Sequence, residues 1–167
     1  GTFVNNEYGF LLVRMGRTEE AEKTFRKMAG MPENWRKAKG LRSLALFQMY
    51  KGQYAAALEN LREAVNVNMS LQGKLSEFRD HVYRAIAFQR KRQSDGFDRE
   101  AAAMEKIRSA MKIEPFFLTK LGTLYARANR VREAERLLES VKSAVGDLLA
   151  ASGVSRSAQS DQAAYHR

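Results

Sequence analysis

Cysteine is absent from the 167-residue sequence, and proline and histidine are scarce, at two residues each. The lack of cysteine excludes disulfide bridges and thiolate metal sites. The two histidines, His81 and His166, lie far apart in the chain and belong to no paired-histidine motif, so a histidine-based metal site is not expected. We therefore expect neither a metal ion nor another cofactor.

Long apolar runs are also missing. The longest of them, such as residues 44–47, fall far short of the roughly 20 residues that span a membrane, so no membrane span is expected. No signal peptide is recognisable, which favours a cytoplasmic location. Because the chain begins at Gly1 rather than Met, a fragment of a longer parent protein is an open alternative.

The residues that are abundant favour helix and carry an excess of positive charge. Alanine, leucine, arginine, glutamate, lysine and methionine dominate, and all are good helix formers. Lysine and arginine number 29 against 19 aspartates and glutamates, a net charge of +10. This charge favours an acidic partner such as an acidic peptide or nucleic acid, and the competing interpretation is an ordinary solvated surface.

One pattern of helix, turn and helix is repeated along the chain. In the first two copies Gly16 or Gly52 is followed five residues later by Ala21 or Ala57. A large apolar residue comes four positions later and another apolar residue three positions after that, which defines one face of a helix. The copies predict one domain over residues 1–167 with hairpins at about 2–30, 34–67, 71–113 and 115–151.

The third and fourth copies are less regular than the first two. In the third we expect a helix over about residues 71–92, a turn over 91–98, and core positions at Ala103, Ile107 and Ala110. In the fourth, Leu121-Gly122 and Tyr125 precede Ala134, Leu138 and Val141. Residues 152–167 are expected to form a polar loop and part of a capping or next-repeat helix.

These residues resemble the tetratricopeptide repeat, whose motif is Leu-Gly-x-x-Tyr, a turn Gly or Asn, Ala-x-x-x-Phe-x-x-Ala and a closing Pro. The resemblance covers about residues 2–151, with irregular spacing similar to the arrays in larger bacterial signalling and regulatory proteins. It implies an all-α, right-handed α-α superhelix of about four hairpins. Small residues would allow close helix packing at Gly9, Ala45, Ala57, Gly122 and Ala134, and large ones would fill the space between hairpins at Phe25, Leu61, Ile107 and Leu138.

In this family the first helix of each hairpin lines a concave groove. By resemblance, the groove would be lined by Phe3, Asn6, Phe10, Arg14, Lys39, Arg42, Leu46, Met49, Tyr50, Arg84, Gln89, Lys91, Thr119, Thr123 and Arg127. Cations beside apolar side chains suit an acidic, partly apolar peptide, because the charges pair with carboxylates while the apolar residues anchor the ligand. The competing interpretation is that these are surface charges beside core residues.

No set of residues supports catalysis. Paired carboxylates, nucleophile–base sets and phosphate-binding glycine loops are all missing, and Gly96-Phe97 is interpreted as a hairpin turn. We therefore expect a non-enzymatic scaffold for protein–protein interaction. The alternatives are a basic helical-repeat module that binds nucleic acid, which the basic runs 36–39 and 90–92 motivate, and an unrecognised enzyme. Self-association through exposed solenoid ends is also open.

Overall fold

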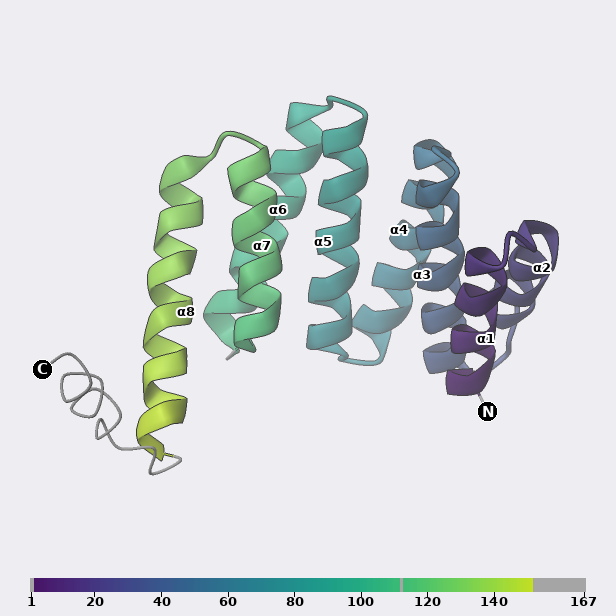
Figure 1. The fold of residues 1–167 in the computed structure, drawn as a ribbon, viewed down its shortest axis with the longest axis horizontal. Helices are drawn as coiled ribbons and strands as arrows, with labels where there is room; N and C mark the ends of the chain where they lie inside the picture. Colours follow the sequence, from purple (N-terminus) through teal and green to yellow (C-terminus); the bar gives the residue numbers. More distant parts are fainter. Residues whose placement is uncertain (1, 112, 152–167) are drawn as a thin grey trace, which may run out of the picture. The chain divides into compact units, whose positions relative to one another are not determined.

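The computed structural model describes residues 2–111 and 113–151, and all regular secondary structure in these ranges is α-helical. The described helices are α1 (Thr2–Arg14), α2 (Thr18–Ala29), α3 (Asn34–Tyr50), α4 (Tyr54–Ser70), α5 (Lys74–Arg90), α6 (Ser94–Ala110), α7 (Pro115–Arg127) and α8 (Val131–Ala151). The prediction of an all-α chain of helical hairpins is confirmed (Figure 1). The loop and partial helix expected over 152–167 lie outside the described residues.

The chain divides into two compact units, Gly1–Lys112 and Ile113–Arg167. In the first unit each helix from α1 to α6 packs against the next one, and in the second unit α7 packs against α8. The two units are described separately below. Pro115 does not end a hairpin, because it is the first residue of α7, where its missing N–H has no helical partner to lose.

Five of the connections are three-residue turns with the same backbone geometry. The middle residue of each turn has a positive φ, between 54° and 76°, at Gly16, Gly52, Gln72, Arg92 and Asn129. The next N–H bonds the carbonyl five residues before it, as in the pairs Arg17–Leu12, Gln53–Gln48, Gly73–Asn68, Gln93–Phe88 and Arg130–Tyr125. This is the Schellman arrangement that satisfies the last carbonyls of a helix. The turns therefore provide a common register for all eight helices.

The register of the third hairpin was predicted wrongly. The turn covers residues 91–93 rather than 91–98, and Gly96 and Phe97 lie inside α6. Counted from the left-handed residue Arg92, positions five, nine and twelve are Phe97, Ala101 and Met104, all buried, whereas Ala110 is exposed. The cause is that the small and the large core residues have exchanged positions. In α2 and α4 the small residue precedes the large one, whereas in α6 Phe97 precedes Ala101.

The core of the first unit follows the predicted small-and-large pattern in its first two hairpins. Phe25 is fully buried, and its ring lies 5.0 Å from Phe10 and 5.9 Å from Phe47 between ring centroids. A Cβ on Gly9 would stand 2.3 Å from the Phe25 ring, so the predicted close approach of α1 and α2 depends on glycine. The predicted core residues Ala57 and Leu61 are likewise fully buried.

In the second unit one predicted core residue is wrong. Leu138 is 53% exposed, and the neighbouring Leu137 is the buried residue that packs toward α7, at 3% exposure. A Cβ on Gly122 would stand 3.7 Å from the Cβ of Leu137, an ordinary contact, so a glycine is not required there. In the first unit the corresponding positions are covered by the following helix, and no described helix follows α8.

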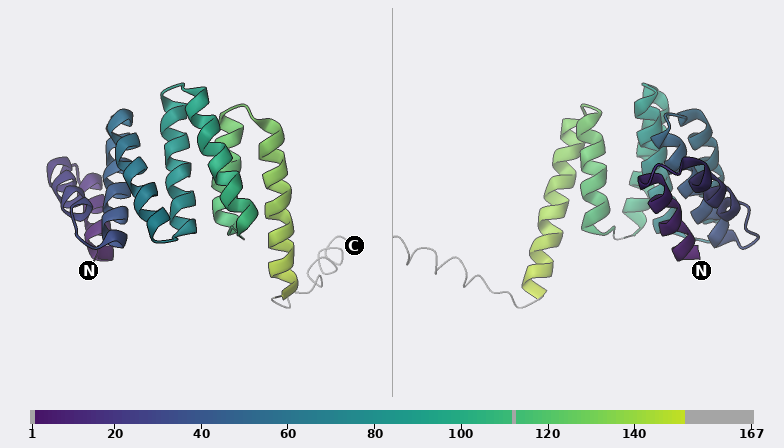
Figure 2. Two further views of the ribbon diagram at one scale, coloured as in Figure 1. Left: turned by 180° about the vertical axis from the view of Figure 1, so that it is seen from behind. Right: turned by 45° about the vertical axis from the view of Figure 1, so that its right-hand side comes forward.

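The helices of the first unit form two layers. The odd-numbered helices α1, α3 and α5 contact one another in series, whereas α2, α4 and α6 contact only their neighbours in sequence. In Figure 1 the odd-numbered helices lie toward the viewer, and the reverse view in Figure 2 brings α4 and α6 forward. We call α1, α3 and α5 the inner helices and α2, α4 and α6 the outer helices.

Candidate partner-binding face

Helix α3 is buried on every side except one. From Ala38 to its end, the only side chains that are not buried are Lys39, Leu46, Met49 and Tyr50. Their spacing of seven, three and one residues places them on one face of the helix. The open stripe of α3 is therefore the set that was predicted to line the groove, apart from Arg42, which is 8% exposed.

The common turns locate the equivalent stripe on the flanking helices. Counted back from the left-handed residue of each turn, Leu46 corresponds to Phe10 in α1 and to Ile86 in α5. All three are half-buried, and we call them the central row. With it we define the inner face of the first unit as Phe10, Val13, Arg14, Lys39, Leu46, Met49, Tyr50, Arg79, Ile86, Gln89 and Arg90.

Charge is segregated between the two layers. The inner helices carry nine basic and three acidic residues, a net charge of +6, and the outer helices carry seven and nine, a net charge of −2. The acidic residues of α5, Glu77 and Asp80, are buried, at 6% and 0% exposure. Glu7 is exposed and accepts a hydrogen bond from Asn6 at 3.1 Å. The positive charge of the first unit's helices is therefore concentrated on the inner layer.

A buried ion pair joins two inner helices. Arg42 of α3 donates from Nε and Nη2 to the carboxylate of Asp80 in α5, the second bond measuring 3.0 Å, and Asn68 of α4 donates to the same carboxylate at 2.7 Å. Arg42 also donates to the Ser76 carbonyl at 3.3 Å. The prediction that Arg42 binds a partner is untested, but its guanidinium is already bonded to Asp80.

Asn6 makes a similar link between α1 and α3. Its side-chain oxygen accepts a hydrogen bond from the hydroxyl of Ser43, which is 4% exposed. Polar contacts therefore connect all three inner helices beneath the inner face. Each contact specifies which residues of two neighbouring helices meet. The contacts therefore fix the positions of Phe10, Leu46 and Ile86 relative to one another.

Arg79 is the inner-face cation with the most constrained surroundings. Burial, followed by repulsion from Arg42, lowers its pKa from the ordinary value, while Asp80 and Tyr83 act in the opposite direction. The side chain remains a cation, since an arginine keeps its proton in proteins. Its Nε is buried and finds no hydrogen-bond partner within the described part of the chain. The Nη2 of the same guanidinium donates to the Ser76 hydroxyl at 3.3 Å.

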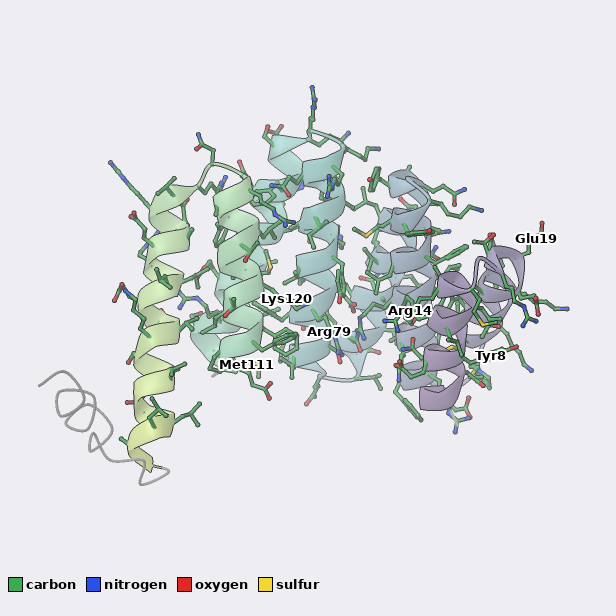
Figure 3. The ribbon with its side chains drawn as sticks, in the orientation of Figure 1. Tyr8, Arg14, Glu19, Arg79, Met111 and Lys120 are labelled. Carbon is green, nitrogen blue, oxygen red and sulfur yellow. The ribbon has the colours of Figure 1, made fainter. Side chains whose placement is uncertain are left out.

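Figure 3 shows Arg14 on α1 and Arg79 on α5, both on the side of the first unit turned toward the viewer. Arg14 is exposed, and Arg90 at the end of α5 is exposed as well. Arg14, Tyr50 and Arg90 occupy one equivalent position, two residues before the left-handed residue of their turns. Lys39 and Arg79 occupy another, thirteen residues before it. The central row thus lies between two rows that contain cations.

Arg84, a predicted partner-binding residue, faces a different direction. Its Nη2 lies 2.9 Å from Glu100 of α6, and His81 Nδ1 contacts the same carboxylate at 2.7 Å. Glu100 is 3% exposed, so the three residues form a buried contact between an inner and an outer helix. His81 is itself 8% exposed. By the turn register, the α5 residues on the inner face are Arg79, Ile86, Gln89 and Arg90.

The other predicted site residues lie at helix ends or in the second unit. Lys91 directly follows α5. It lines an open pocket together with Glu22, Arg26 and Gln48, next to the turn between α3 and α4. Thr123 and Arg127 are exposed on α7, which carries two basic residues and no acidic one. No finding tests whether any of these residues binds a partner.

No group of three histidine, aspartate or glutamate side chains in residues 2–111 and 113–151 is arranged to hold a metal ion. Across the same residues, no helix combines the length and the apolar character needed to cross a membrane.

Comparison with known proteins shows a fold relationship. No protein-family profile and no curated protein matches the chain. A solved structure that matches is the crystal structure of BtubC (BKLC) from P. vanneervenii, with a TM-score of 0.68 at 17% sequence identity. The match covers 88% of this chain and 64% of that chain, so this chain spans less than two thirds of its neighbour. At this identity the similarity concerns the fold alone.

Proposed function

We propose that the chain is a non-enzymatic scaffold whose inner face binds an acidic, partly apolar segment of a partner protein. The observation that supports this proposal is the composition of that face. Phe10, Leu46 and Ile86 form a half-exposed apolar row, and the cations Arg14, Arg79 and Arg90 flank it, with no carboxylate of residues 2–111 or 113–151 bonded to them. The resemblance to the tetratricopeptide repeat, in which the first helices line a groove, supports the same assignment.

The apolar row favours a protein segment over nucleic acid. Half-buried leucine and isoleucine gain from contact with apolar side chains, whereas phosphate groups would bring only charge to this row. The basic run at the start of α3 is already paired within the chain: Arg36 bonds Glu33 at 2.9 Å and Lys37 bonds Glu63 at 2.6 Å. Arg14, Arg79 and Arg90 lie instead beside the apolar row.

A panel of fluorescent peptides of equal length tests the proposal by anisotropy. One peptide combines aspartate and glutamate with leucine and phenylalanine, one replaces the acids with lysine, one replaces the apolar residues with serine, and a single-stranded DNA provides the nucleic-acid comparison. We expect only the acidic, apolar peptide to bind tightly. Its affinity should fall as salt rises, because the steering charges are exposed.

The matched pair of variants is Arg79→Glu on the inner face and Arg99→Glu on the exposed side of α6. Both change the net charge equally. Loss of a charge-assisted contact costs about 1.5–3 kcal/mol, so Arg79→Glu should weaken binding roughly 10-fold to 100-fold, and Arg99→Glu less than about two-fold. If both variants weaken DNA binding equally and the acidic peptide does not bind, the scaffold proposal is wrong and a nucleic-acid-binding module is the better description.

A further inference from the structure

Helix α8 carries an apolar stripe that the described residues of the second unit, 113–151, leave open. Its members are spaced alternately by three and four residues, at Val131, Ala134, Leu138, Val141, Val145 and Leu148. Val131 is 54% exposed, Leu138 53%, Val145 42% and Leu148 61%, and Ala134 and Val141 are half-buried. A three-four alternation over 18 residues is the heptad pattern by which two helices pack side by side.

The first unit shows what this face does in a hairpin. Counted from the left-handed residue of each turn, Leu138 corresponds to Phe25 in α2 and to Leu61 in α4. Both are fully buried, because the next inner helix covers them: Phe25 packs on Phe47 of α3, and Tyr83 of α5 packs against the cluster that contains Leu61. The α8 stripe is thus a surface of a kind that takes a further helix.

The stripe also extends beyond its partner in the hairpin. Helix α8 has 21 residues and α7 has 13, and Figure 1 shows α8 continuing past the end of α7. Val145, Leu148 and Leu149, all exposed, belong to this continuation. An apolar surface of this kind on a soluble chain marks an interaction site.

We propose that a second copy of this chain covers the stripe, with the two α8 helices antiparallel about a two-fold axis. In this arrangement Val131 faces Leu148 of the second copy, Ala134 faces Val145, and Leu138 faces Val141. Each small residue then meets a larger one, so six layers form from three kinds of pair. The stripe is complementary to itself when it is reversed.

The charges beside the stripe select the same arrangement. Glu135 and Lys142 occupy equivalent heptad positions on one flank, and both are exposed. The axis that forms the apolar layers brings Glu135 of one copy beside Lys142 of the other, twice in the dimer. Within its own helix Lys142 bonds Glu139 at 2.7 Å on the surface, an arrangement that leaves the ammonium able to reach a second carboxylate. In a parallel pair these residues of the two copies would lie on opposite flanks of the interface, so the pairing of Glu135 with Lys142 would not form.

Sedimentation equilibrium of the 167-residue chain from about 1 to 200 µM tests the dimer. A stripe of six residues is at the small end of specific interfaces, so association should be reversible in this range. The mass should rise with concentration from 19.0 kDa toward twice that value, and Leu138→Glu should remain at 19.0 kDa with unchanged helicity. A chain that stays monomeric throughout, or a dimer that Leu138→Glu leaves intact, would overturn the proposal.

Charge exchange tests the geometry independently of folding. Glu135→Lys and Lys142→Glu should each weaken self-association about 10-fold, and the variant carrying both should recover it. An equimolar mixture of the two single variants should form heterodimers in preference to either homodimer, since all cross-copy pairs are then attractive. If the mixture associates no more strongly than either single variant does alone, the antiparallel pairing is contradicted.

Because the chain has no cysteine, a disulfide provides a direct measure of register. Ala134→Cys and Val145→Cys chains, mixed under mild oxidation, should cross-link with each other and not with themselves. Self-linked Ala134→Cys dimers would indicate a parallel pair and overturn the proposal. The acidic peptide should still bind the Leu138→Glu variant if the inner-face proposal holds, so the two proposals fail separately.

Discussion

Removal of Asp80 should be among the most destabilising single changes in the first unit. The Asp80 side chain is 0% exposed and accepts two hydrogen bonds from Arg42 and one from Asn68. Asp80→Ala leaves the Arg42 guanidinium, at 8% exposure, without its counter-charge, and it removes the attraction that opposes repulsion between Arg42 and Arg79. Breaking a buried pair in this way costs about 3–5 kcal/mol of unfolding free energy.

Urea unfolding followed by circular dichroism at 222 nm measures this loss. With a slope of about 2 kcal/mol per molar urea, the midpoint should fall by roughly 2 M. Asp80→Asn should lose less, because an amide keeps the volume and part of the hydrogen bonding. The double variant Arg42→Met/Asp80→Leu should recover most of the loss, since replacing both charges removes the unpaired one.

The result that would refute this reasoning is a loss below about 1 kcal/mol for Asp80→Ala, a value typical of exposed ion pairs. A double variant as unstable as the single one would also contradict it. In that case the contribution of Asp80 would come from packing alone, and Arg42 would be available to a ligand as the sequence suggested.

Three further changes test the backbone geometry, each by the urea midpoint. Arg92→Gly should stabilise the chain by about 0.5–1 kcal/mol, because Arg92 has φ 56° in the left-handed region, where glycine carries no steric cost; a loss would show that the arginine side chain makes a contact of greater value. Gly40→Ala should cost about 1–3 kcal/mol, because its Cβ would stand 2.3 Å from the backbone of Met28 and Ala29, and a neutral result would mean that α2 and α3 can move apart. Gly146→Ala in α8, with nothing within 4 Å of the added Cβ, should instead stabilise by about 0.5–1 kcal/mol, and a loss would argue against a helix there.

The features that sequence predicted well are those repeated with the same residue types. Gly16 and Gly52 mark two turns directly, and the alanine five residues after each glycine locates the buried face of α2 and α4. Asn129 marks the turn of the fourth hairpin for the same reason, since asparagine tolerates positive φ. The existence and order of the hairpins followed from these signals.

The third hairpin was misread because both of its signals are unusual. Arg92 takes the conformation that glycine takes elsewhere, and Phe97 stands where the other hairpins have alanine. The predicted groove residues of α5 consequently included Arg84 and omitted Arg79 and Ile86. Alignment of Arg92 with Gly52, 40 residues earlier, would have found the correct set.

The buried polar pairs had no signal in the sequence. Asp80 and Glu100 look like the exposed acids of any helix, and only the packing of α3 on α5 and of α5 on α6 brings them to Arg42 and His81. The residues in these contacts are 38 and 19 positions apart in the sequence. Their contacts depend on tertiary structure, which local patterns do not report.

The uniform turns give the chain a property that matters for its engineering. Helices α3 to α6 each have 17 residues and start every 20 residues, so duplication of residues 54–93 would add one outer and one inner helix without changing the phase of the others. The inner face would then gain a second Ile86 and a second Arg79. The duplicated Asp80 would face Val82, which occupies the position of Arg42 in α5, so a lengthened protein needs Val82→Arg as well. The length of the solenoid can therefore be changed in whole hairpins, provided that each new aspartate is given its arginine.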